Sequence, residues 1–204
     1  MTNEPRHRLQ CQCGRLAGDV ATTTLVNRGL CYCRDCQAFA FFLGHAERTL
    51  DDRGGTDIVQ ISPGAVRFTD GREHLACMRL TATGLLRWYA ACCRTPIGNT
   101  APDYRLSFVG LIDRCLDDPA RSLDASFGPS NMRVHTGSAW GEPKLRQRGL
   151  AVAALRFARM LLRARLTGTY RDTPFFGRDG VPVVTPRVLS ADERAAVMNS
   201  VARR

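Results

Sequence analysis

The sequence predicts a mostly β fold, with antiparallel sheets over residues 9–115 and a helical C-terminal extension over residues 116–204. Three observations lead to this prediction. Short runs of apolar and β-branched residues in the first part are interrupted by Gly and Pro, as in strands joined by turns. A long stretch in the second part has the period of a helix. Cysteines gather at three places in the first part, which indicates a metal-binding domain.

The first part of the chain divides into short elements. Strands are expected over residues 9–20, with a tight turn at Gly14, and over residues 57–61, 66–68, 75–80 and 85–91. Residues 37–43 are strongly apolar and predict either a short helix or a buried strand. The last strand leads into a turn that contains Pro96. Many short strands of this kind favour an antiparallel arrangement.

The extension has two predicted helices. Residues 150–166 carry Arg156, Arg159 and Arg163 at helical spacing, which predicts one basic face and a leucine face that packs on the first domain. A membrane surface or a partner is the alternative contact for such a helix. Ser190 and Glu193 form a capping-box pattern that starts a helix over residues 190–201. Both helices are expected to pack on the β domain.

Composition limits the partners and the compartment. The net charge is 29 − 19 = +10, and Lys144 is the only lysine. Arginine pairs with carboxylates and phosphates, so acidic small molecules are candidate partners. Aromatic content is 7% and no RNA-binding signature is present, so nucleic acid is not expected. No apolar run approaches the roughly 20 residues of a membrane span, and the first eight residues lack a signal-peptide core, which predicts a cytoplasmic protein with reduced thiols.

Cys31, Cys33 and Cys36 are the central motif of the chain. On a strand, Cys31 and Cys33 would leave by the same face, and a turn would bring Cys36 back to them. Three thiols at this spacing suit zinc and leave one tetrahedral position open, as catalytic zinc sites do. A chance grouping or a redox pair is the alternative. Cys77 lies inside an apolar strand and is expected to be a core residue.

The order of the cysteine motifs resembles the glutathione-dependent formaldehyde-activating enzyme family, which includes centromere protein V. The resemblance rests on Cys11-x-Cys13-Gly14, on Cys31-x-Cys33-x-x-Cys36 and on Cys93-x-Thr-Pro-Ile97, over residues 9–98. It implies a β-tent fold of twisted antiparallel sheets. It also implies a structural zinc on the first and last motifs, and a labile zinc with a glutathione site on the central motif.

Two features depart from that family. Ala90 stands where the family has a metal ligand, and Arg94 stands where it has glycine; the long extension is also absent from the small family enzymes. We therefore expect a diverged subfamily in which Cys11, Cys13 and Cys93 take Cys92 as fourth ligand. Adjacent residues on a strand point to opposite faces, so Cys92 and Cys93 converge only if the chain turns there.

Three functions are compatible with the sequence. The first is a zinc-dependent carbon–sulfur lyase that acts on the adduct of glutathione, or a similar thiol, with a small carbonyl compound. Cys31, Cys33 and Cys36 would then be the catalytic site, and Arg34 or Arg94 would pair with a substrate carboxylate. The second is a non-catalytic zinc module whose basic extension binds a macromolecular partner. The third is a thiol-based redox or metal sensor.

Overall fold

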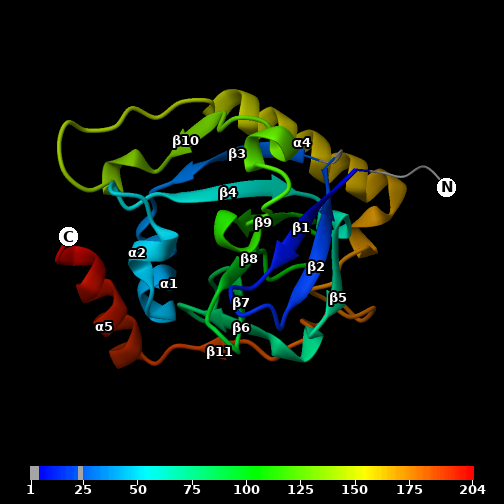
Figure 1. The fold of residues 1–204 in the computed structure, drawn as a ribbon, viewed down its shortest axis with the longest axis horizontal. Coiled ribbons are helices and arrows are strands. Elements are labelled where there is room, and N and C mark those ends of the chain that lie inside the picture. The colour runs from blue at the N-terminus through cyan, green and yellow to red at the C-terminus, as the bar shows by residue number, and fades with distance from the viewer. Residues whose placement is uncertain (1–4, 23–24) are drawn as a thin grey trace.

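Two β-sheets form the body of the molecule in the computed structural model, which describes residues 5–22 and 25–204 (Figure 1). The smaller sheet has the strand order β1-β2-β5 and is antiparallel throughout. The larger has the order β10-β3-β4-β9-β8-β7-β6-β11. Its six inner strands are antiparallel, as expected. The signal-peptide prediction concerns in part residues 1–4, which lie outside the described residues.

The described residues form the following strands and helices. The strands are β1 (Arg6–Gln10), β2 (Ala17–Ala21), β3 (Leu25–Cys31), β4 (Thr56–Ile61), β5 (Val66–Asp70), β6 (Leu75–Arg79), β7 (Leu86–Ala90), β8 (Pro96–Thr100), β9 (Val109–Ile112), β10 (Met132–Val134) and β11 (Arg187–Val188). The α-helices are α1 (Arg34–Leu43), α2 (Ala46–Thr49), α3 (Leu123–Phe127), α4 (Leu150–Thr167) and α5 (Ala191–Ala202). The coarse prediction of large β-sheets with some helices is confirmed.

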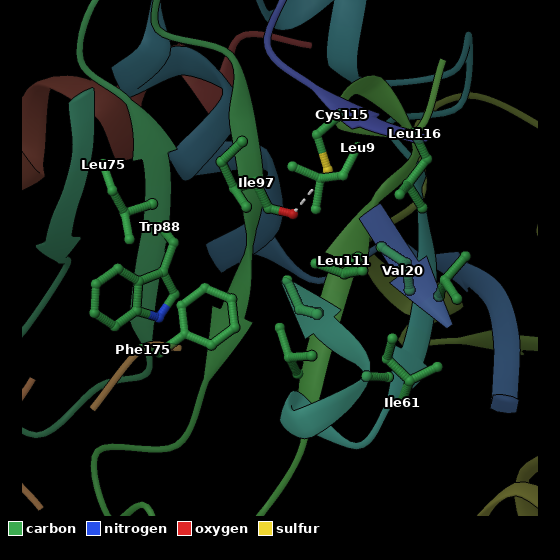
Figure 2. Close-up of a cluster of buried hydrophobic side chains, with 14 of the residues drawn as sticks. Leu9, Val20, Ile61, Leu75, Trp88, Ile97, Leu111, Cys115, Leu116 and Phe175 are labelled. Atoms are coloured by element: carbon green, nitrogen blue, oxygen red, sulfur yellow. Dashed lines mark hydrogen bonds between the residues drawn. The ribbon is translucent and has the colours of Figure 1, made fainter. Parts of the chain in front are cut away.

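The main core lies between the two sheets. Leu9 and Val20 from the small sheet meet Ile61 and Leu111 from the large one, all of them fully buried (Figure 2). Side chains alternate along a strand, so each of these strands turns one apolar row toward the core. Cys77 belongs to the same core at 3% exposure, as its apolar surroundings predicted.

The C-terminal extension is part of the fold rather than an appendage. It supplies both edge strands of the large sheet, because β10 pairs in parallel with β3 and β11 pairs in parallel with β6. Phe175, beyond α4, is fully buried with its ring 5.1 Å from that of Trp88 (Figure 2). The division at residues 115 and 116 therefore does not separate two independent cores.

Helix α1 begins and ends at residues that suit these positions. Cys33 is the N-cap, and its Sγ accepts a hydrogen bond from the Cys36 amide. Gly44 ends the helix in the left-handed conformation, with φ 82°, which glycine adopts without strain. Of the two predictions for residues 37–43, the helix is the one that the structure contains. Its apolar side chains Phe39 and Leu43 pack with Val201 of α5.

The two predicted helices of the extension are present. The capping box of Ser190 and Glu193 is formed at the start of α5. Helix α4 lies along β3 and β10, at the outer edge of the molecule (Figure 1). Its leucine face was wrongly predicted, because Leu155 and Leu162 are more than half exposed and the buried contacts are made by Ala153 and Ala164. Within the described residues, no helix combines the length and apolar character needed to cross a bilayer.

Candidate metal centres

Seven of the nine cysteines form two groups in the structure, and the sulfurs of each group lie within 4.8 Å of one another. We call them the four-thiol cluster (Cys11, Cys13, Cys92, Cys93) and the three-thiol cluster (Cys31, Cys33, Cys36). Among the described residues, no disulfide joins any of them. The sequence prediction of these two groups agrees with the geometry.

Two turns build the four-thiol cluster. The chain reverses after β1, where Gly14 has φ 78° and its amide donates to the Cys11 carbonyl at 2.9 Å. A second turn follows β7, where Arg94 has φ 58° and its amide donates to the Ala90 carbonyl at 2.8 Å. This is the turn that Cys92 and Cys93 require in order to face the same point. A hydrogen bond of 3.0 Å from the Gln12 amide to the Thr95 hydroxyl joins the two turns.

The sulfur positions of the four-thiol cluster fit a tetrahedral zinc. Cys92 Sγ lies 3.7 Å from Cys11 Sγ, 3.3 Å from Cys13 Sγ and 3.9 Å from Cys93 Sγ. In a tetrahedron with Zn–S bonds of about 2.3 Å, the ligand sulfurs lie roughly 4 Å apart. Cys92 thus joins the other three thiols, as expected from the sequence. Four sulfurs complete the coordination shell, which is the composition of a structural zinc site.

The protonation of the four-thiol cluster is uneven. Burial raises the pKa of Cys93, but hydrogen bonds from the Thr95 hydroxyl and from backbone amides outweigh it and bring that pKa to about 6. Burial and the neighbouring thiols raise the pKa of Cys92. Cys93 is therefore the sulfur that most readily carries negative charge when no metal is bound, and the other thiols can donate to it.

The three-thiol cluster lies where β3 passes into α1. Cys31 is the last residue of the strand, Cys33 is the helix N-cap and Cys36 lies in the first turn, with its Sγ 3.9 Å from that of Cys31. Cys33 therefore caps a helix instead of continuing the strand of Cys31 as predicted, whereas Cys36 does fold back toward Cys31. Three sulfur ligands leave a fourth position free for a further ligand.

A hydrogen-bonded loop supports this cluster. Tyr32, between two of the thiols, is buried and donates its hydroxyl hydrogen bond to Asp51 at 3.1 Å. The other oxygen of Asp51 accepts from the Gly55 amide at 2.7 Å. A side chain at Gly55 would meet the Tyr32 ring at 2.7 Å, so this position requires glycine. The loop thus holds the backbone between Cys31 and Cys33 in place.

A buried arginine lies beside the three-thiol cluster. Arg87 on β7 is 2% exposed, and its Nη1 lies 4.0 Å from Cys36 Sγ and 3.1 Å from Asn99 Oδ1. Its Nη2 lies 3.6 Å from the Asp35 carboxylate, and its guanidinium lies over the Phe39 ring. Hydrogen bonds from Cys31 and Cys33, together with the charge of Arg87, hold the pKa of Cys36 well below its usual value despite burial. The thiolate that a metal needs is stabilised here before any metal binds.

Sequence reasoning missed Arg87. Side chains alternate along β7, so Trp88 enters the core between the sheets and Arg87 points to the opposite face, toward α1. A charged residue in a strand usually indicates a solvent-facing side, and nothing local shows that a helix covers it. The same strand runs on to the four-thiol cluster, so β7 contributes to both centres.

A cavity of about 410 Å³ opens along the N-terminal part of α1. Arg34 and Gln37 line it from α1, Trp140 lines it from a loop, and Asn199 lines it from α5. Gln37 follows the N-cap Cys33 by about one helical turn, so the cavity and the three-thiol cluster share the start of α1, although none of the three thiols lines the cavity. Of the two predicted substrate-binding arginines, only Arg34 lies at this cavity.

The structure places Arg94 elsewhere. Its Nε donates to the Leu43 carbonyl at 3.0 Å and its guanidinium lies over the Phe42 ring, at the C-terminal end of α1. Cys36 is in the first turn of the same helix. Arg94 therefore supports the helix end, and we do not carry it forward as a substrate ligand.

Two buried polar atoms at this cavity have no hydrogen-bond partner among the described residues. Gln37 Nε2 donates to the carbonyls of Tyr32, Gly54 and Ser138, which fixes the orientation of the amide. Gln37 Oε1 is then left as an unpaired acceptor, and Trp140 Nε1 as an unpaired donor. Unpaired buried polar groups are costly, so these two atoms indicate a place for a polar ligand or water. Neither residue stands in a motif, so sequence reasoning did not select them.

One family model matches most of the chain. Residues 6–185 match the model of a family of unknown function, DUF6151. The matched region contains both clusters and α4, whereas α5, which lines the cavity with Asn199, lies beyond it. A search of curated proteins gave no match.

Proposed function

The chain belongs to the DUF6151 family, and from its site geometry we propose that it is a zinc-thiolate enzyme of the carbon–sulfur lyase type. In this proposal the four-thiol cluster holds a structural zinc, and the three-thiol cluster holds a labile zinc with one open position. The observation that carries it is the presence of two separate thiol clusters, one complete and one lacking a fourth ligand. A cavity lined by Arg34 and Gln37 opens along the same helix that carries Cys36.

The chemistry follows from the open position. Zinc there would lower the pKa of a substrate thiol and hold its sulfur beside a small carbonyl compound. The sulfur then bonds to the carbonyl carbon, the C=O π bond breaks, and the thiol proton ends on the oxygen. The reverse direction splits the adduct. Glutathione or a similar acidic thiol fits the cavity best, because Arg34 offers a cation and Gln37 and Trp140 offer an acceptor and a donor.

We extend the proposal to fold family and location. The order of cysteine turns after β1, β3 and β7 is the order on which the resemblance to the formaldehyde-activating family rests, so we propose that the two sheets are a β-tent. Nine free cysteines suit a reducing compartment, which supports a cytoplasmic location. The unfilled fourth position at the three thiols favours an enzyme over a closed zinc module.

The decisive experiment replaces Cys36 by Ser. We expect the unmodified protein to retain two zinc ions, one of which a mild chelator removes, and Cys36→Ser to retain only the tightly bound one. Formation of the adduct from glutathione and formaldehyde, followed by NMR exchange, should be lost in the variant while the melting temperature changes by only a few degrees.

Cys115→Ser is the matched control, because Cys115 is also fully buried but belongs to neither cluster. It should keep both zinc ions and full turnover. Global unfolding of Cys36→Ser, or turnover equal to that of the unmodified protein, would contradict the catalytic assignment.

A further inference from the structure

Helix α4 exposes an unusual amount of apolar surface. Its side chains at Val152, Leu155, Leu162 and Leu166 are 55%, 63%, 60% and 79% exposed. Toward the protein, the helix uses Ala153, Ala164 and the ring of Phe157, which lies 5.2 Å from that of Phe108. The leucines therefore lie on a different side of the helix from the side that packs on the protein.

The exposed apolar residues form one stripe. Their spacings of three, seven and four residues keep them within roughly 80° of one another on a helix of 3.6 residues per turn. Arg159 lies within the stripe, Arg156 and Arg163 border it on one side, and Arg165 borders it on the other. We call this surface the α4 outer face. Helix α4 itself runs along the edge of the molecule (Figure 1), and the side chains of the stripe are exposed.

Positive charge is concentrated along α4 and the segments on either side of it. Residues 143–171 contain no acidic residue, and their basic residues are Lys144, Arg146, Arg148, Arg156, Arg159, Arg163, Arg165 and Arg171. This segment therefore carries a charge of +8, against +10 for the whole chain. Within the described residues, none of the four arginines of the helix forms an ion pair. The face is left open to an anionic partner.

We propose that the α4 outer face binds the surface of an anionic phospholipid membrane. An apolar stripe bordered by arginines is the arrangement in which leucines enter the acyl boundary while guanidinium groups reach the headgroup phosphates. A second copy of the chain is disfavoured, since it would bring Arg159 and its neighbours against the same arginines.

The size of the surface also favours a membrane over a protein partner. A helix of 18 residues is about 27 Å long and about 10 Å wide, which gives a projected face of roughly 270 Å². A standard protein interface buries about 800 Å² of accessible surface per partner, so a protein partner would have to extend beyond this helix. A bilayer needs no complementary groove, and its anionic lipids contribute about 1 kcal/mol per arginine near the surface, a factor of about five in affinity.

Vesicle co-sedimentation tests this proposal with the full chain. We expect binding to vesicles of phosphatidylcholine and phosphatidylserine to exceed binding to pure phosphatidylcholine by about tenfold or more, and to weaken as salt rises. Replacing two of the exposed leucines, Leu155→Gln with Leu162→Gln, should reduce binding about tenfold or more. Arg156→Gln with Arg163→Gln should do the same for the anionic vesicles only.

The controls are exposed residues away from α4. Val181 is 57% exposed, and Arg178 is also exposed, so Val181→Gln and Arg178→Gln should bind like the unmodified protein. Circular dichroism must show that the variants remain folded. Equal binding to both vesicle types, or leucine variants that bind normally, would overturn the proposal. So would a dimer that Leu155→Gln dissociates, or binding to an acidic amphipathic peptide without any binding to vesicles.

Discussion

The two thiol clusters use the same ligand atom, yet the four-thiol cluster is stabilised by backbone turns and the three-thiol cluster by a buried charge. At the first, sulfurs accept from the Leu16 amide and pair with the Thr95 hydroxyl. At the second, Arg87 lies 4.0 Å from Cys36 Sγ and a cavity opens along the same helix. The comparison teaches that four sulfurs are enough to close a coordination shell. A reactive site needs in addition a charge that stabilises the thiolate and an open position that a substrate can reach.

The strongest test of this contrast removes a thiol from each cluster. Cys92→Ser should lose the tightly bound zinc and reduce the free energy of unfolding by about 4 kcal/mol or more, because metal binding contributes directly to folding. Cys33→Ser should lose only the labile zinc and leave most of the stability. Zinc content and urea unfolding, measured on both variants, check the expectation. Equal loss of stability in the two would mean that both clusters are structural.

A smaller effect is expected for the charge beside the three thiols. Arg87→Gln should lower the free energy of unfolding by about 2 kcal/mol, because Asn99 Oδ1 and Asp35 lose a buried partner. It should also speed zinc release from the three-thiol cluster by about tenfold or more without affecting the four-thiol cluster.

Arg94→Gln is the matched control for that change. Arg94 also lies over a phenylalanine ring, but it donates to a main-chain carbonyl at the other end of α1. Its loss should affect stability alone. Equal acceleration of zinc release in both variants would assign the effect of Arg87 to packing rather than to charge.

The smallest effect concerns pH in the metal-free protein. The pKa of Cys93 falls from 9.0 to about 6 on folding, so its thiolate contributes stability that is fully present above pH 9 and is lost as the pH falls through 6. As the pH falls from 9 to below 6, the difference in unfolding free energy between the unmodified protein and Cys93→Ser should therefore become smaller. Urea titrations in chelator at several pH values measure it.

Cys115→Ser gives the comparison for that titration. Burial raises the pKa of Cys115, so its thiol is neutral throughout the interval and its contribution should not vary. A pH-independent effect at Cys93 as well would show that its sulfur does not carry the charge.

Several features could be predicted from local sequence. Strand and turn patterns led to the strands between residues 9 and 91, and the capping box of Ser190 and Glu193 led to α5. The thiol spacing selected Cys31, Cys33 and Cys36, although these converge across a strand end and a helix cap rather than on one strand. The prediction that the leucine face of α4 packs on the core was wrong. Helical periodicity shows which residues share a side of the helix, but it does not show which side the rest of the fold covers.

Sequence alone determined the local elements and which cysteines can act together, since turn chemistry, strand alternation and ligand spacing depend on residues a few positions apart. Tertiary structure decided what lies around them. It alone placed Arg87 beneath α1, opened the cavity between Gln37, Trp140 and α5, and left the leucines of α4 exposed. These features join residues far apart in the chain, and their distances follow from how the sheets and helices pack, which no local pattern encodes.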